Sequence, residues 1–156
     1  MSMGITDAQA MTGIQVDDKA FLAFERRSNQ AGIRGIYFLE FDRKNGTVIQ
    51  DPDAALAAAP KVIDAVADYN NKDVDRIFLY ANKAGTEVTI TFMTVPDQNN
   101  TTFVYTGRIV NNAYTPCSAP AQIQANWKNT FGFYYDDNTK NKFMLFANGK
   151  ILAEAH

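Results

Sequence analysis

Residues 86–110, TEVTITFMTVPDQNNTTFVYTGRIV, contain the clearest regular pattern in this sequence. Apolar residues alternate with other residues in two parts of it, which places on one side Val88, Ile90, Phe92, Phe103, Tyr105 and Ile109. A period of two is typical of half-buried antiparallel strands. The turn-forming residues at 96–100 separate the two parts. With the apolar run at 76–81, the pattern predicts three consecutive antiparallel strands over residues 74–110.

The C-terminal third continues in the same way. Short apolar runs at 130–135, 142–147 and 150–153 predict further strands, and Asn148-Gly149 is a strong hairpin signal between the last two. The chain has 13 Asp and 14 Asn but only 4 Glu. Asp and Asn favour turns and caps over helix interiors, which is typical of a chain rich in hairpins.

The N-terminal half predicts helices as well as strands. Residues 1–16 are weakly patterned and are interpreted as an N-terminal arm. A helix is expected over residues 18–27, with Phe21 and Phe24 on its core face. A strand is expected at 33–41, with a hairpin return at 47–50. A second helical pattern covers 54–69, and Pro60 is expected to break or kink it, with the firmer helix at 60–69.

These elements predict one α+β domain over residues 17–156. Its expected architecture is a strongly twisted, mainly antiparallel sheet of about seven to eight strands. Two or three helices, contributed mostly by the N-terminal half, are expected to pack on one face. A chain of 156 residues is long enough for one such core.

Composition argues against several classes of protein. The net charge is −2 and the basic residues are scattered, so nucleic-acid binding is not expected. No apolar run approaches 18 residues and no leader pattern is present, so we expect a soluble, cytoplasmic protein without a membrane span. Cys117 is the single cysteine, which excludes a disulfide within the chain.

Known catalytic and cofactor motifs are not found in the sequence. The single histidine is the last residue, His156, which argues against histidine-based triads and zinc sites. Neither a dinucleotide fingerprint nor a phosphate loop can be aligned to the dispersed glycines. The acidic loop at 136–141 lacks the glycine and the final acid of a calcium loop. No metal and no cofactor are therefore predicted, and a protein without catalytic activity is favoured over an enzyme.

Glu40 and Arg108 are the candidates for acid–base chemistry. Glu40 lies between Leu39 and Phe41 in a strand that is apolar on both faces. A buried carboxylate has a raised pKa and suits a general acid, and Arg108 is available to pair with it. The alternative is that Glu40 lies near the strand end and reaches water.

Aromatic residues near the C-terminus are the candidates for binding. The expected contact residues are Trp127, Tyr134, Tyr135 and Tyr114. Exposed aromatic side chains are enriched at interaction sites, although core packing is the alternative role for each.

Three functional hypotheses follow. The first is a non-catalytic binding module, meaning an adaptor, inhibitor, immunity-type or assembly protein that uses the aromatic surface. The second is a small-molecule pocket between sheet and helices, with or without acid–base chemistry from Glu40 and Arg108. The third is a structural subunit of a homo-oligomer. The expected partner is thus another protein or a small ligand, and a cavity of several hundred cubic ångströms would favour the second hypothesis.

Overall fold

The computed structural model describes residues 7–45, 52–117, 119–124, 130–135, 142–146 and 151–154. Within these ranges the chain consists of antiparallel sheets and two short helices. The elements are, in order, β1 (Ala8–Val16), β2 (Lys19–Arg26), β3 (Gly35–Asp42), α1 (Pro52–Ala57), β4 (Lys61–Asp64), α2 (Ala65–Tyr69), β5 (Val74–Ala81), β6 (Val88–Thr94), β7 (Thr101–Val110), β8 (Ala113–Pro116), β9 (Ala121–Gln124), β10 (Thr130–Tyr135), β11 (Lys142–Phe146) and β12 (Ile151–Glu154).

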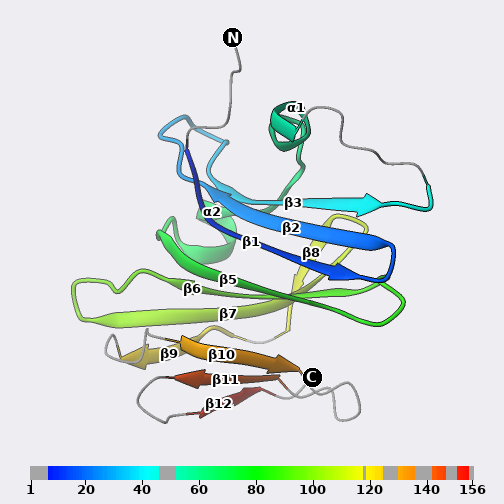
Figure 1. Ribbon diagram of the computed structural model, residues 1–156. Coiled ribbons are helices and arrows are strands. Elements are labelled where there is room, and N and C mark those ends of the chain that lie inside the picture. The colour runs from blue at the N-terminus through cyan, green and yellow to red at the C-terminus, as the bar shows by residue number, and fades with distance from the viewer. Residues whose placement is uncertain are drawn as a thin grey trace.

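The strands form three sheets, which follow one another in chain order in Figure 1. The first sheet has the order β1-β2-β3-β4, and the second has the order β5-β6-β7-β8 with β9 also paired to β7. The third sheet has the order β10-β11-β12. The molecule is therefore mainly β. The predicted antiparallel character is confirmed, whereas the predicted α+β architecture with one sheet is not found.

The largest difference from the sequence prediction lies at residues 18–27, which form strand β2 instead of a helix. Lys19–Arg26 pairs with β1 on one side and with β3 on the other. Phe21 and Phe24 consequently point to opposite faces of the sheet, because successive side chains in a strand alternate. Both rings are buried, in separate core clusters. Burial on both sides removes the polar face on which the helical interpretation depended.

The predicted N-terminal arm also contributes a strand. Residues 8–16 form β1 and pair with β2 through a turn at Asp17, whose φ is 50°. Asp tolerates this left-handed conformation better than most residues do.

The predicted helix over 54–69 is divided into three elements. Helix α1 ends at Ala57, residues 61–64 form β4, and α2 begins at Ala65. The break expected at Pro60 is thus observed, but the firm helix predicted after it is only five residues long. Asp64 caps α2, since its Oδ1 accepts from the amides of Val66 and Ala67 at 3.0 and 3.1 Å.

The strands predicted at 33–41 and over 74–110 are confirmed. Strands β5, β6 and β7 pair consecutively, and Val88, Ile90 and Phe92 share one buried face. The strands predicted in the C-terminal third correspond to β10, β11 and β12. The predicted hairpin return at 47–50 and the Asn148-Gly149 turn lie outside the described residues.

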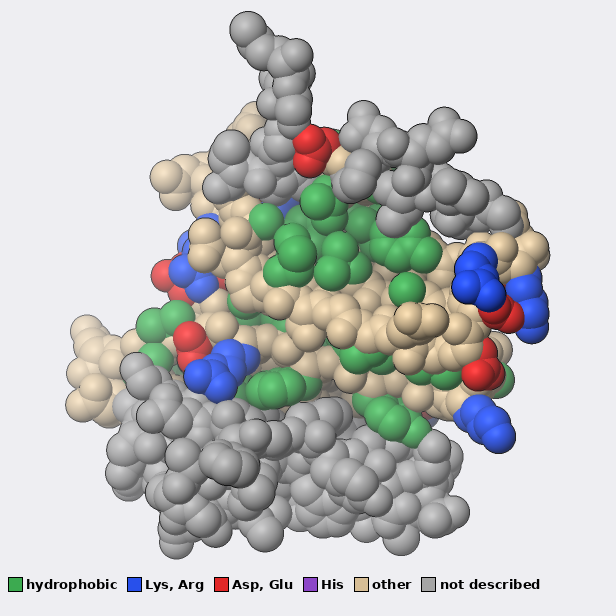
Figure 2. Space-filling view, viewed as in Figure 1, with side chains coloured by type: hydrophobic (Ala, Val, Ile, Leu, Met, Phe, Trp, Pro, Cys, Tyr) green, Lys and Arg blue, Asp and Glu red, His purple; other side chains and the backbone are tan. Residues whose placement is uncertain are grey.

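The main core lies between the first and second sheets, where side chains of β2 and β3 meet those of β5, β6 and β7. Every residue of β6 is buried, as expected for a central strand covered on both faces. On the face shown in Figure 2, acidic and basic side chains of the described residues lie beside one another in small groups.

Within the described ranges, no helix has the length and apolar character needed to cross a membrane.

Candidate functional site

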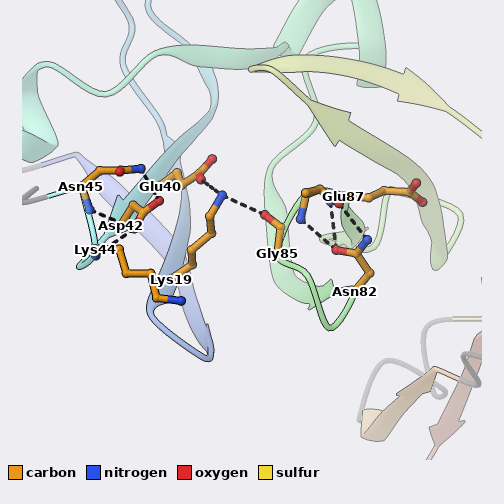
Figure 3. Close-up of polar contacts among 9 residues, drawn as sticks. Lys19, Glu40, Asp42, Lys44, Asn45, Asn82, Gly85 and Glu87 are labelled. Carbon is orange, nitrogen blue, oxygen red and sulfur yellow. Dashed lines mark hydrogen bonds and ion pairs between the residues drawn. The ribbon is translucent and has the colours of Figure 1, made fainter.

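Glu40 lies on the surface of β3 and pairs with Lys19, which joins two sheets. Lys19 Nζ donates to Glu40 Oε1 at 2.6 Å and to the carbonyl oxygen of Gly85 at 3.2 Å (Figure 3). Gly85 belongs to the β5–β6 turn, so this lysine joins the first sheet to the second. The hydrogen bond that Lys19 donates to Glu40 raises the pKa of Lys19. The carboxylate of Glu40 reaches water and is not buried as a general acid would be.

Arg108 does not pair with Glu40. Its Nε lies 3.4 Å from Oε1 of Glu87, the residue directly before β6. The pairing of Glu40 with Arg108 considered from the sequence is therefore wrong: Glu40 pairs with Lys19, and Arg108 pairs with Glu87.

The aromatic candidates are placed only in part. Tyr114 on β8 is half-buried and packs against the main core. Its ring lies close to Gly107, where an added Cβ would come within 2.2 Å of Tyr114 Cε2. Tyr134 and Tyr135 are neighbouring residues of β10. Trp127 lies outside the described residues.

The strongest electrostatic feature of the described residues is Glu25, which the sequence did not single out. Glu25 lies on the core face of β2 and is fully buried. Its Oε2 accepts from Arg27 Nε at 2.7 Å and from the amide of Val74 at 3.2 Å. The hydroxyl of Tyr69 lies 3.5 Å from Oε1. Glu25 therefore joins β2 to β5 and to α2.

Burial disfavours the ionised form of this carboxyl and raises the pKa of Glu25. The hydrogen bond and charge of Arg27 act in the opposite direction. Burial also raises the pKa of Tyr69, and the nearby Glu25 charge adds to that shift. Both observations describe a low-dielectric site in which every polar contact has a large effect on stability.

Arg34 connects Glu25 to the surface. Its Nη2 donates to Asp73 Oδ1 and lies 3.9 Å from Glu25 Oε1. Its Nε is buried and has no hydrogen-bond partner within the part of the chain that the structure describes. Arg34 is thus held on one side by two carboxylates and lines a cavity on the other.

That cavity has a volume of about 350 Å³. It lies between the β2–β3 loop and the segment around α2, and the residues that line it are Ser28, Asn29, Gln30, Ala31, Gly32, Arg34, Asp64, Val66 and Asn71. Its volume lies at the lower end of the range for small-molecule sites, about 300–1,000 Å³. We refer to it as the loop–α2 cavity.

The walls of the loop–α2 cavity are fixed by local hydrogen bonds. Lys61 Nζ donates to the carbonyl oxygen of Gly32 at 2.7 Å and to Asp64 Oδ2 at 2.5 Å, which ties the loop to the start of α2. The hydroxyl of Tyr37 donates to the carbonyl oxygen of Ile33 at 2.6 Å. A wall held in this way is ordered before any ligand arrives, which lowers the entropic cost of binding.

A second depression of about 300 Å³ lies beside the β1–β2 turn. Asp18, which lines it, already forms ion pairs with Arg43 and Lys44. Among the described residues no group of three or more His, Cys, Asp or Glu side chains is arranged to hold a metal ion.

One signal in the sequence pointed to Glu25. If residues 19–26 are taken as a strand, Phe21, Ala23 and Glu25 fall on the same face, so the acid follows two core residues. The helical interpretation hid this, because it put Glu25 near a polar helix end beside two arginines. The loop–α2 cavity had no such signal, since its two walls are at least 30 positions apart in the chain.

Comparison with known proteins supports the fold. No family model matches the chain, and a search of curated proteins finds no match. The crystal structure of an endo-arabinase from Bacteroides thetaiotaomicron VPI-5482 is similar, with a TM-score of 0.51 and 16% sequence identity. The match covers 97% of this chain and 56% of the endo-arabinase chain, so this chain spans about half of that protein's length. At this identity the likeness concerns the fold alone, because one fold hosts many functions.

Proposed function

We propose that this chain is a binding module that takes up a small molecule in the loop–α2 cavity. The observation that carries the proposal is a cavity of about 350 Å³ whose loop wall is tied to the start of α2 by the hydrogen bonds of Lys61 to Gly32 and Asp64. A site that is ordered before the ligand arrives loses less entropy on binding.

The two carboxylates near Arg34 also support the proposal. Arg34 is oriented by Asp73 and lies near the fully buried Glu25. A side chain held by a surrounding shell of contacts is characteristic of binding sites whose geometry must be kept within narrow limits.

The proposal is tested by filling the cavity. We expect Ala31→Phe to weaken binding of a cavity ligand at least tenfold, because the ring would occupy space that the ligand needs. Ala31 is exposed, so the variant should keep its thermal stability. The ligand is found by screening small molecules against the ¹⁵N-labelled chain, and the amides expected to shift are those of residues 28–34 and 64–71.

Ala84→Phe is the matched control, since Ala84 is an exposed alanine in the β5–β6 turn. It should bind with unchanged affinity. The proposal fails if the screen finds no compound that shifts these amides, or if Ala31→Phe binds as tightly as the control.

A protein partner bound through the aromatic third sheet is a second proposal. Tyr134 and Tyr135 both lie in β10, which pairs with β11 in this sheet. Alanine at a binding hot spot costs about 2 kcal/mol or more. We therefore expect one of Tyr134→Ala and Tyr135→Ala to lose the partner while remaining folded. Equal partner affinity of both folded variants in a pull-down titration would remove this proposal.

A further inference from the structure

Residues 28–32 form one whole wall of the loop–α2 cavity, and we refer to them as the flap. Every residue of the flap lines the cavity. The segment belongs to no strand or helix, and its last four residues are exposed to solvent. A movement of the flap would therefore widen the cavity along that entire side.

The chain is held firmly at both ends of the flap. Before it, the amide of Arg27 donates to the carbonyl oxygen of Asp7 at 3.0 Å. After it, the carbonyl oxygen of Ile33 accepts from the hydroxyl of Tyr37 at 2.6 Å. These contacts fix the two points about which the flap can turn, as hinges do in loops that cover binding sites.

The flap itself is tied to the rest of the described chain by one hydrogen bond, which Lys61 Nζ donates to the carbonyl oxygen of Gly32 at 2.7 Å. The other hydrogen bonds within this part of the structure are local. The amide of Gln30 donates to Ser28 Oγ at 3.1 Å, and the amide of Ile33 donates to the carbonyl oxygen of Gln30 at 3.2 Å. A segment with an exposed backbone and few long-range contacts opens at a small cost in free energy.

Lys61 is held in the position that this bond requires. Its ammonium group also donates to Asp64 Oδ2 at 2.5 Å, and Asp64 is fixed because its Oδ1 caps α2. The stem of Lys61 passes over Gly35, where an added Cβ would lie 2.7 Å from Lys61 Cδ. Hydrogen bonds from a charged donor are stronger than those between neutral groups, so this single bond is a substantial restraint.

We infer that Lys61 is a latch: its ammonium group holds the flap closed against α2, and its release opens the cavity for a ligand to enter and leave. The inference rests on the proposed function for its ligand, and it adds the regulation of the same site. Because one ammonium group makes the tie, a change that removes its charge unties the flap.

The first test is amide hydrogen exchange of the free chain, compared between the wild type and Lys61→Met. We expect the amides of Gln30 and Ile33 to exchange at least about tenfold faster in the variant, since both donate within the segment that the latch holds. The amides of β6 should exchange at the wild-type rate, which shows that the opening is local. If methionine lowers the thermal stability, Lys61→Gln repeats the test with a polar, uncharged end.

Lys19→Met is the matched control. Lys19 also donates to a carboxylate and to a glycine carbonyl, Glu40 Oε1 at 2.6 Å and Gly85 at 3.2 Å (Figure 3). Its side chain is 27% exposed, against 24% for Lys61, but it ties the first sheet to the β5–β6 turn. Exchange at Ile33 should remain at the wild-type rate. Equal exchange at Ile33 in the Lys61 and Lys19 variants would overturn the inference.

The second test uses a compound found in the screen described above, with rates taken from ¹⁵N line shapes. In Lys61→Met both its association and its dissociation rate should rise at least fivefold over Lys19→Met, because a closed flap slows entry and exit alike. A change confined to the dissociation rate would indicate a lost contact and would refute the latch as a gate. If the screen finds no compound, the proposed function falls, and the exchange rates alone decide whether Lys61 holds the flap.

Discussion

Replacing Glu25 by alanine is expected to lower the free energy of unfolding by about 1–3 kcal/mol, the cost of leaving a buried donor without its acceptor. The carboxylate accepts from the amide of Val74, which is fully buried and would lose this partner. Arg27 also donates to the carboxylate, but its side chain is 31% exposed and keeps Asp73 at 3.8 Å. The raised pKa of Glu25 does not contradict this expectation, because it reports the cost of burying the charge.

Glu40→Ala is the matched control. Glu40 also forms an ion pair, with Lys19, but its side chain is 43% exposed. Exposed ion pairs contribute about 0–1 kcal/mol to stability. The free energy of unfolding of this variant in urea should therefore lie within about 1 kcal/mol of the wild-type value. Similar losses of stability in the two variants would show that Glu25 is not the buried tie described here.

The pH dependence of stability provides a second readout for Glu25. Burial raises its pKa in the folded state above the ordinary value of 4.5, so the folded state holds its proton to higher pH than the unfolded state. By linkage, the stability that this proton contributes is fully present below pH 4.5 and is lost as pH rises through the folded-state pKa. The difference in unfolding free energy between the wild type and Glu25→Gln should therefore fall with rising pH above 4.5. A difference that rises over this interval would contradict the sign of the shift.

Replacing Phe92 by alanine is expected to lower the free energy of unfolding by about 3–5 kcal/mol, the usual cost of emptying a fully buried ring position. Phe92 is 0% exposed in the centre of β6. Its ring stacks on Tyr105 with centroids 4.8 Å apart and meets the edge of Tyr69 at 5.5 Å. Neither neighbour can close the cavity, because each is held in a strand or helix of its own.

Phe103→Ala is the comparison within the same sheet. Its ring is half-buried and lies under the ammonium group of Lys72, 4.4 Å from Nζ to the ring centroid. Less apolar area leaves water when this ring packs, so we expect less than half the loss seen for Phe92→Ala. Urea unfolding of the two variants measures the difference, and equal losses would mean that the core is not centred on β6.

The strands of residues 74–110 could be predicted because their signal is local. Alternation of apolar and polar residues places Val88, Ile90 and Phe92 on one face of a strand whatever its neighbours are. The break at Pro60 was predictable for the same reason, since a proline restricts its own backbone and removes its own donor.

Residues 19–26 were not predictable in this way. Their apolar side chains fit one face of a helix and also both faces of a buried strand, so the local pattern allows either structure. Pairing with β1 and β3 provides backbone hydrogen bonds on both sides and buries both Phe21 and Phe24. This gain depends on contacts between distant segments, and it outweighs a helix propensity that is small per residue.

Local sequence patterns were enough to show that this protein is rich in antiparallel strands and where the period-two segments lie. They did not show that β6 is buried on both faces, or that Val104 rather than Phe103 is buried in β7. The tertiary structure alone decided that Glu25 is buried, that Glu40 pairs with Lys19 rather than Arg108, and that a loop and a short helix far apart in the chain form a cavity. The difference lies in how far apart along the chain the interacting residues are. Alternation and backbone restriction act between neighbouring residues, whereas burial, charge pairing and cavities depend on which distant segments the folded chain brings together.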